Sequence, residues 1–480
     1  MPKNPRQCLL PLLAGYLYLA GSASFLGQWD TYDYLKQIVT HQLSDLGFGR
    51  PVYIGYNILI WESARRVFGL ETLDVEAVAM IATVVFGVAG VVLFHRLARE
   101  FFPPPASRMA ALGFALSPMY ALYSGFIMTE VPMLTVLVAS ALILWKRWSR
   151  YPVLSDVLGG LLFGAAIGIR EQAATLGPAF LWILSSRRPA GHSRLRSAAL
   201  FGGAAVLAVL VPVLSIYVAD PAGFVNRIGT WLHAIPLGHS QFRNNLQASL
   251  LFAFVTCPAA WLAAGAAGIC ALSRRRRPPE GESPSQESSI PNGLFGVVCG
   301  IGLPIAALWR DADVQMHPRY LLLILPGSLI FCTSIYHRWV RSRGGAAAWA
   351  VVHVLVFGAG LTILSPIRQT QTEKMEFARK VRDAVPGPGL MIAGSYSPIL
   401  DYYRGIGVRP EWRILWTGWD WDAETADRMV RKAWADRKPV YFSEDSLGWR
   451  YFESEYLHFY SLFRDCRKEA VIPRLSRVYP

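Results

Sequence analysis

The sequence has few charged residues for its length. Only 17% of its 480 residues are Asp, Glu, Lys or Arg, whereas 53% are hydrophobic, and an ordinary soluble domain has about 25% charged residues. The apolar residues are also gathered into long runs, of which residues 78–93 contain no charge. Because about 20 apolar residues span a bilayer, this composition excludes a typical soluble protein and predicts a multi-pass protein of the cell (inner) membrane.

Acidic residues are scarcer than basic ones, with 33 Asp and Glu against 47 Lys and Arg and a net charge of +14. Such an excess can indicate nucleic-acid binding. The basic clusters, however, lie between the apolar runs, in every second predicted loop. The positive-inside rule produces this distribution, so we expect membrane lipid, and no nucleic acid, among the partners.

Cysteine is also rare, with six residues in the chain. Four of them lie in or at the ends of apolar runs: Cys257, Cys270, Cys299 and Cys332. Since no pair has the spacing of a zinc site or a redox motif, we assign the cysteines no chemistry.

The apolar runs, oriented so that the basic loops face the cytoplasm, predict eleven membrane spans. Their ranges are 8–27, 76–95, 107–127, 129–145, 154–169, 172–186, 197–218, 249–272, 293–309, 320–336 and 346–364. Residues 1–364 would form a transmembrane domain with a first outer loop at 28–75, and residues 365–480 a soluble domain. The predicted fold class is mainly α: a polytopic helical membrane bundle with a small C-terminal α/β domain outside the cytoplasm.

Residue patterns also predict local structure. The start of the first outer loop has an apolar stripe opposite a polar one, as in a helix that lies in the interface plane. Gly160, Gly164 and Gly168 repeat at helical spacing and would let two helix backbones approach closely. In the C-terminal domain we expect helices at 372–385, 423–434 and 449–459 and strands at 390–394 and 439–443.

Four polar clusters fall on the predicted outer face, and the first follows the first span. On a helix, Asp30, Asp33 and Tyr34 share one face because they are spaced i, i+3 and i+4. A carboxylate at a partly dry interface can act as a general base. The alternative is a solvated helix N-terminus, where Asp is favoured by the helix dipole and by capping.

The second and third clusters lie in outer turns between spans. Glu130 follows Thr129 at one turn, where a simple first-turn acid is the structural alternative. Arg170 and Glu171 are adjacent in the next outer turn, where the alternative is a structural ion pair. Arg170 is a candidate for binding phosphate, and Glu130 for binding substrate.

The fourth cluster leads into the tenth span. His317 and Arg319 can bind a phosphate, the arginine by a bidentate fork, and Tyr320 would contact substrate. The alternative is an interfacial anchor, in which Arg and Tyr reach the headgroups. Because an ionised side chain at the centre of a membrane helix costs about 2.5–3.5 kcal/mol, four such clusters on one face favour a shared cavity at the outer membrane boundary.

Taken together, the motifs resemble the GT-C superfamily, which includes protein O-mannosyltransferases and the aminoarabinose transferases of lipid A. The resemblance extends over essentially the whole chain. It rests on the following matches: Trp29-Asp30 with Tyr32 and Tyr34, Gly49-Arg50-Pro51-Val52-Tyr53, Ser117-Pro118, Thr129-Glu130, and Arg319-Tyr320 with Pro326. The sequence departs from the family in having Asp30-Thr31 where Asp-Glu is commoner, so a second acid must be Asp33 or come from elsewhere.

The resemblance implies an inverting glycosyltransferase, a hexosyl- or pentosyltransferase that uses a polyprenyl-phosphate sugar. Asp30 would be the base, with Asp33 the second catalytic acid, and Arg170, His317 and Arg319 would stabilise the departing lipid phosphate. Tyr34, Glu130 and Tyr320 would bind substrate, and the acceptor would be an extracytoplasmic glycan, lipid or protein. No spacing demands a cofactor, although the acidic motif is compatible with a divalent metal.

Two other classes of function are compatible with a polytopic chain. A lipid-linked glycan flippase or other transporter would carry internal repeats and polar groups at mid-membrane, and we find neither in the sequence. A non-catalytic scaffold could use the tryptophans of the C-terminal domain as an aromatic surface. Those tryptophans would otherwise be core residues or stack on sugars.

Overall fold

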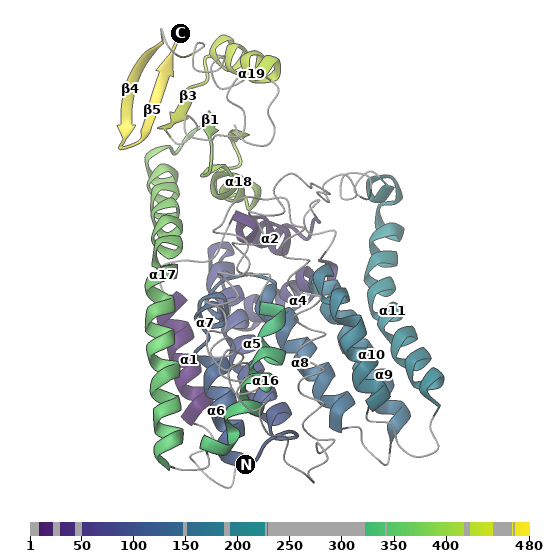
Figure 1. The fold of residues 1–480 in the computed structure, drawn as a ribbon. Helices are drawn as coiled ribbons and strands as arrows, with labels where there is room; N and C mark the ends of the chain where they lie inside the picture. The colour runs from purple at the N-terminus through teal and green to yellow at the C-terminus, as the bar shows by residue number, and fades with distance from the viewer. Residues whose placement is uncertain are drawn as a thin grey trace, which may run out of the picture. The chain divides into compact units, whose positions relative to one another are not determined.

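The computed structural model (Figure 1) describes residues 9–22, 29–43, 50–146, 151–186, 193–225, 228, 322–340, 343–416, 423–444, 463 and 466–480. The chain divides into two compact units. The first, residues 1–23, 45–57 and 79–366, is called the helical unit. The second, residues 24–44, 58–78 and 367–480, contains the sheet and is called the mixed unit. The described part is mainly helical with one small sheet, which confirms the mainly α part of the predicted class.

The helical unit is built from apolar helices. These are α1 (Leu9–Ser22), α5 (Val75–Ala98), α6 (Pro104–Ala115), α7 (Pro118–Ser124), α8 (Glu130–Lys146), α9 (Pro152–Ile169), α10 (Gly177–Ser186), α11 (Arg194–Ala219), α16 (Leu325–Val340) and the first half of α17 (Arg343–Ala384). Within the described ranges, four helices are long and apolar enough to cross a membrane: residues 72–98, 152–169, 194–219 and 344–362.

Several predicted spans differ from the structure. The span at 107–127 is two helices, α6 and α7, because Pro118 begins a new helix after Ser117, which has extended backbone. The span at 172–186 starts as a short 3₁₀ helix, Glu171–Leu176, before α10. The spans at 249–272 and 293–309 lie outside the described residues.

Helix α17 combines two predicted elements. The span at 346–364 and the helix at 372–385 belong to one helix of 42 residues. The change from apolar to polar composition near residue 365 therefore marks the end of the apolar sequence and not the end of the helix.

The glycine stripe on α9 does what the sequence predicts. A Cβ at Gly160 would collide with the Phe201 carbonyl oxygen, and one at Gly164 with the Ala205 carbonyl oxygen. Both carbonyls belong to α11, so the two helices pack backbone to backbone. Gly168 makes room in the same way for Val52, in the first turn of α4 (Pro51–Phe68).

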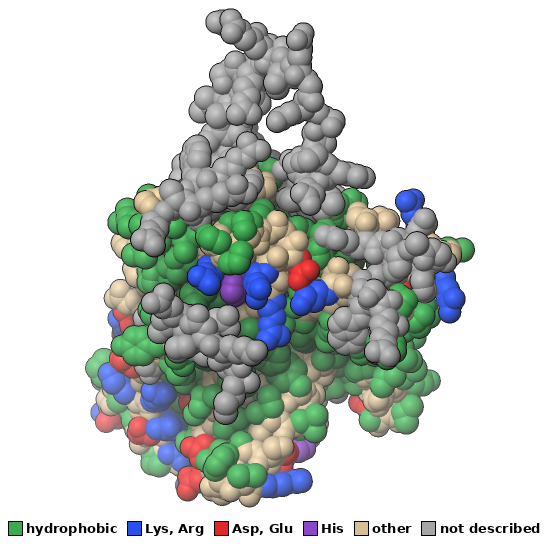
Figure 2. Space-filling model, turned by 90° about the horizontal axis from the view of Figure 1, so that it is seen from below, with side chains coloured by type: hydrophobic (Ala, Val, Ile, Leu, Met, Phe, Trp, Pro, Cys, Tyr) green, Lys and Arg blue, Asp and Glu red, His purple; other side chains and the backbone are tan. Residues whose placement is uncertain are grey.

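Basic side chains gather on one face of the molecule. Figure 2 shows Lys and Arg side chains and a histidine among hydrophobic ones. In the helical unit, the last turn of α5 supplies His95 and Arg96, and Lys146 at the end of α8 lies 3.6 Å from Glu100. The end of α8 and the turn after α5 thus lie close together.

The mixed unit combines helix α2 (Trp29–Thr40) with a five-stranded sheet of order β2-β1-β3-β5-β4. Its remaining elements are β1 (Gly389–Ala393), α18 (Ser397–Gly405), β2 (Trp412–Trp416), α19 (Ala423–Ala435), β3 (Val440–Ser443), β4 (Arg467–Ile472) and β5 (Leu475–Tyr479). Strands β2, β1 and β3 are parallel, whereas β5 is antiparallel to both β3 and β4. The core of this sheet includes Ile392, Val430, Val440, Phe442 and Val478.

The predictions for this domain are partly confirmed. The strands at 390–394 and 439–443 and the helix at 423–434 are present, within a residue or so, as β1, β3 and α19. Elements α18, β2, β4 and β5 were missed, and the helix predicted at 449–459 lies outside the described residues.

Candidate active site

The helical unit contains a buried cluster of charged and polar side chains. Arg170 follows the last residue of α9, and its Nη1 donates to Glu130 Oε1 and to Thr129 Oγ1, each at 2.7 Å. Its Nε donates to Gln172 Oε1 at 2.7 Å. The Arg170 and Glu130 side chains are only 1% and 0% exposed, so the ion pair is shielded from water.

Helix ends explain how this cluster forms. Glu130 is the first residue of α8, where a negative charge is favoured by the helix dipole. Arg170 has extended backbone, because α9 has just ended and the 3₁₀ helix begins at the next residue. The structural alternative that we considered for Arg170 paired it with its neighbour Glu171. The 2.7 Å ion pair joins it to Glu130, 40 residues earlier in the chain.

Arg50 is linked to this cluster through Tyr53 and was missed as a site residue. It immediately precedes α4 and is 9% exposed. Tyr53, one turn into α4, is fully buried and interacts electrostatically with both Glu130 and Arg50. Burial raises the pKa of the Tyr53 phenol, Glu130 raises it further and Arg50 lowers it. The sequence contained one signal for Arg50, a cation directly before a helix-starting proline.

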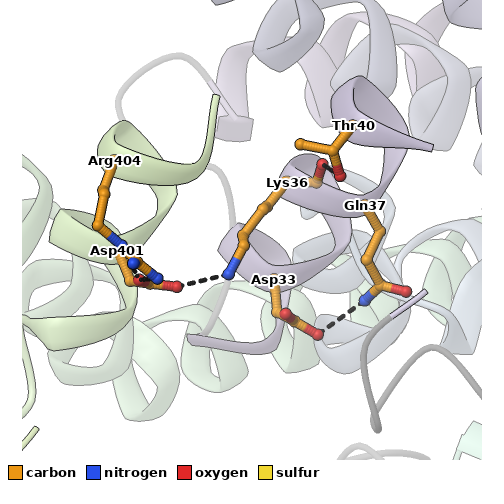
Figure 3. Close-up of polar contacts among 6 residues, drawn as sticks. All are labelled: Asp33, Lys36, Gln37, Thr40, Asp401 and Arg404. Atoms are coloured by element: carbon orange, nitrogen blue, oxygen red, sulfur yellow. Dashed lines mark hydrogen bonds and ion pairs between the residues drawn. The ribbon is translucent and has the colours of Figure 1, made fainter. Parts of the chain in front are cut away.

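The predicted acidic motif lies on α2 in the mixed unit. Asp30 is in the first turn and is 2% exposed, and Tyr34 is fully buried. The Asp33 carboxylate accepts a hydrogen bond from Gln37 Nε2 at 2.7 Å (Figure 3). Asp30 and Gln37 are buried just as the apolar Leu35 is. On the polar side of α2, Asp30 and Gln37 are thus buried, whereas Asp33 is only partly buried and His41, just after the helix, is exposed.

Three predicted site residues belong to the fourth polar cluster. His317, Arg319 and Tyr320 lie outside the described residues. Over the ranges that are described, the structure contains no group of three or more His, Cys, Asp and Glu side chains that could hold a metal ion.

Comparisons with known proteins agree with the fold. Residues 66–216 match a family model described as dolichyl-phosphate-mannose-protein mannosyltransferase. The structure is similar to ArnT from Cupriavidus metallidurans bound to undecaprenyl phosphate, with a TM-score of 0.65 and 12% identity over 98% of this chain and 97% of that chain. ArnT in the apo state matches with a TM-score of 0.62 at the same identity and coverage.

A more distant similarity joins the chain to the oligosaccharyltransferase of Archaeoglobus fulgidus in the apo form. The TM-score is 0.51 and the identity 11%, over 92% of this chain and 70% of that chain. Among the curated proteins no sequence matches. At these identities the structural likeness concerns the fold, and together with the family model it confirms that this chain resembles the GT-C superfamily of integral membrane glycosyltransferases and has its fold.

Proposed function

We propose that the protein is an inverting glycosyltransferase that moves a hexose or pentose from a polyprenyl-phosphate donor to an acceptor outside the cytoplasm. The buried pair of Arg170 and Glu130 carries this proposal. Taking two ions out of water costs several kcal/mol per ion, and ionisable groups kept in a membrane bundle commonly mark functional sites. The GT-C fold makes transfer from a lipid phosphate the reaction that best accounts for them.

The names of the similar proteins support the choice of donor. The matching family model is described by a dolichyl-phosphate sugar, and one similar structure holds undecaprenyl phosphate. A long lipid tail must stay in the bilayer, which accounts for a transferase built from apolar helices.

In the proposed reaction, the acceptor hydroxyl oxygen attacks the anomeric carbon and gives its proton to the Asp30 carboxylate. The new carbon–oxygen bond forms as the bond to the donor phosphate breaks, so the anomeric centre inverts. The electron pair of the broken bond leaves on the phosphate oxygen. Cations at Arg170, His317 and Arg319 stabilise that charge, and Arg50 is a further candidate.

The other residues support this chemistry. Glu130 holds the Arg170 guanidinium in one orientation, in addition to its predicted contact with substrate. Asp33 is the second acid of the motif, and Tyr34 and Tyr320 are the predicted substrate contacts. A divalent metal at the acidic motif would be detected as loss of transfer in EDTA and recovery with added cation.

The decisive experiment measures sugar transfer by purified protein from a panel of labelled polyprenyl-phosphate sugars. Asp30→Asn should lower turnover by about 10²- to 10⁴-fold, as expected for loss of a general base. Asp436→Asn is the matched control, because Asp436 is exposed on the C-terminal domain. Folded Asp30→Asn protein with wild-type turnover would remove Asp30 from the role of base.

A further inference from the structure

Within the mixed unit, helix α2 is held by residues from the far end of the chain. Lys36 Nζ lies 2.7 Å from Asp401 Oδ2 on α18 (Figure 3). Tyr32, one turn earlier on α2, donates from its hydroxyl to Met375 Sδ at 3.2 Å. The Tyr32 ring also lies 6.0 Å from the ring of Tyr402. Two successive turns of α2 are thus fixed by α17 and α18.

The contact between α2 and α18 is close as well as polar. A Cβ at Gly405 would lie 2.7–2.9 Å from three carbons of the Lys36 side chain, so the lysine stem packs directly on the glycine. Asp401 is held in turn by Arg404 Nε at 2.7 Å. The Lys36 and Asp401 side chains are 29% and 30% exposed, which leaves the pair only partly screened by water.

These contacts bear on the acidic motif of the same helix. Lys36 follows Asp33 by three residues, and Gln37, the next residue, donates the hydrogen bond that orients the Asp33 carboxylate. Because Tyr32 and Lys36 are both fixed, α2 cannot rotate about its axis or slide along it without breaking one of the two contacts. The directions of Asp30 and Asp33 are therefore set by residues 375–405.

We propose that the C-terminal part of the mixed unit, residues 367–480, positions α2, the catalytic helix of the proposed glycosyltransferase. Lys36 and Asp401 are the positioning residues. This inference rests on the proposed function, because it assigns the base to α2. Residues 367–480 would then contribute to catalysis without touching the sugar or the lipid phosphate. Their role is to keep the α2 carboxylates within reach of the acceptor hydroxyl.

The test compares two ion pairs of the same length in the same region. Asp401→Asn removes the negative charge that pairs with Lys36, whereas Asp427→Asn removes the negative charge that pairs with Arg431 at 2.7 Å within α19. Because a small misplacement of reacting groups can cost about 100-fold, we expect turnover to fall by about 10- to 100-fold in Asp401→Asn. The KM for the polyprenyl-phosphate donor should change less than the turnover, and Asp427→Asn should match the wild type.

Two further variants separate positioning from general damage. Asp401→Glu keeps the carboxylate and should recover most of the turnover. Lys36→Met combined with Asp401→Asn should be no worse than Asp401→Asn alone, because Lys36→Met removes only an ion pair that Asp401→Asn has already removed. Equal losses in Asp401→Asn and Asp427→Asn, or wild-type turnover in Asp401→Asn, would overturn the positioning role.

Hydrogen–deuterium exchange tests the same contact without any activity. Peptides that cover residues 29–40 should exchange faster in Asp401→Asn than in Asp427→Asn or the wild type. If wild-type protein transfers sugar from no donor in the panel, the proposed function fails while the exchange result still decides whether Asp401 holds α2. Unchanged exchange in Asp401→Asn would refute the inference even if the enzyme is active.

Discussion

The two units contain ion pairs of equal length in different surroundings. In the helical unit, Arg170 and Glu130 meet at 2.7 Å with side chains 1% and 0% exposed. In the mixed unit, Lys36 and Asp401 also meet at 2.7 Å, but their side chains are 29% and 30% exposed. Removing one partner of a buried pair leaves an uncompensated charge, whereas a pair near water contributes little to stability. The two ion pairs therefore contribute differently to stability although their distances are equal.

The largest effect should come from breaking the buried pair. Glu130→Gln leaves the Arg170 guanidinium without its counter-charge, and we expect a loss of about 3–5 kcal/mol in the free energy of unfolding. Unfolding of purified protein in detergent, followed by denaturant titration, measures this change.

A double variant controls for the loss of the side chain itself. Glu130→Leu with Arg170→Met removes both charges, and it should recover much of the stability because apolar replacements of buried pairs are often tolerated. A double variant that is less stable than Glu130→Gln would show that the network contributes more than charge balance.

A second comparison concerns glycines at close contacts, one in each unit. An added Cβ at Gly164 meets the backbone of Ala205, which cannot move alone, whereas at Gly405 it meets the flexible stem of Lys36. We expect Gly164→Ala to cost about 1–3 kcal/mol, as overpacking does, and Gly405→Ala to cost less. Thermal unfolding of the two variants beside Gly203→Ala, which has open space around it, measures the difference. Equal destabilisation by all three would contradict the backbone contact between α9 and α11.

The smallest effect should come from breaking the partly exposed pair of Lys36 and Asp401. Asp401→Asn should reduce the free energy of unfolding by less than about 1 kcal/mol. High salt should erase this difference, because partly exposed charges are screened. The deficit of Glu130→Gln should persist in the same salt series, since its charges are buried. A salt-resistant loss in Asp401→Asn would mean that the pair is better shielded than its exposure indicates.

Composition and periodicity predicted the larger features of the fold. Long apolar runs predicted the helices, and small residues at helical spacing predicted the close approach of α9 and α11. The break between α6 and α7 was missed because the sequence stays apolar on both sides of Ser117. Strand β4 was missed because an exposed edge strand that begins Arg467-Lys468-Glu469 shows no apolar alternation.

The residue types of the candidate site could be predicted from the sequence, but which of these side chains contact one another could not. An acid or a cation near a helix end is visible in the sequence, as Asp30, Glu130 and Arg170 show. The partner of Arg170 was not visible, because Glu130 lies 40 residues away and only the packing of α8 against α9 brings the two together. Arg50 was missed for a related reason, since its link to Glu130 through Tyr53 depends on where α4 begins and how it packs.

The long reach of the α2 contacts has a consequence for biosynthesis. Lys36 and Asp401 are separated by 365 positions in the chain, and ribosomes add about 5–20 residues per second. Helix α2 therefore leaves the ribosome about 20 to 70 seconds before the segment that will hold it. During that interval, its charged and aromatic side chains must be accommodated by lipid headgroups, water or a chaperone, which makes α2 a late-maturing part of the protein.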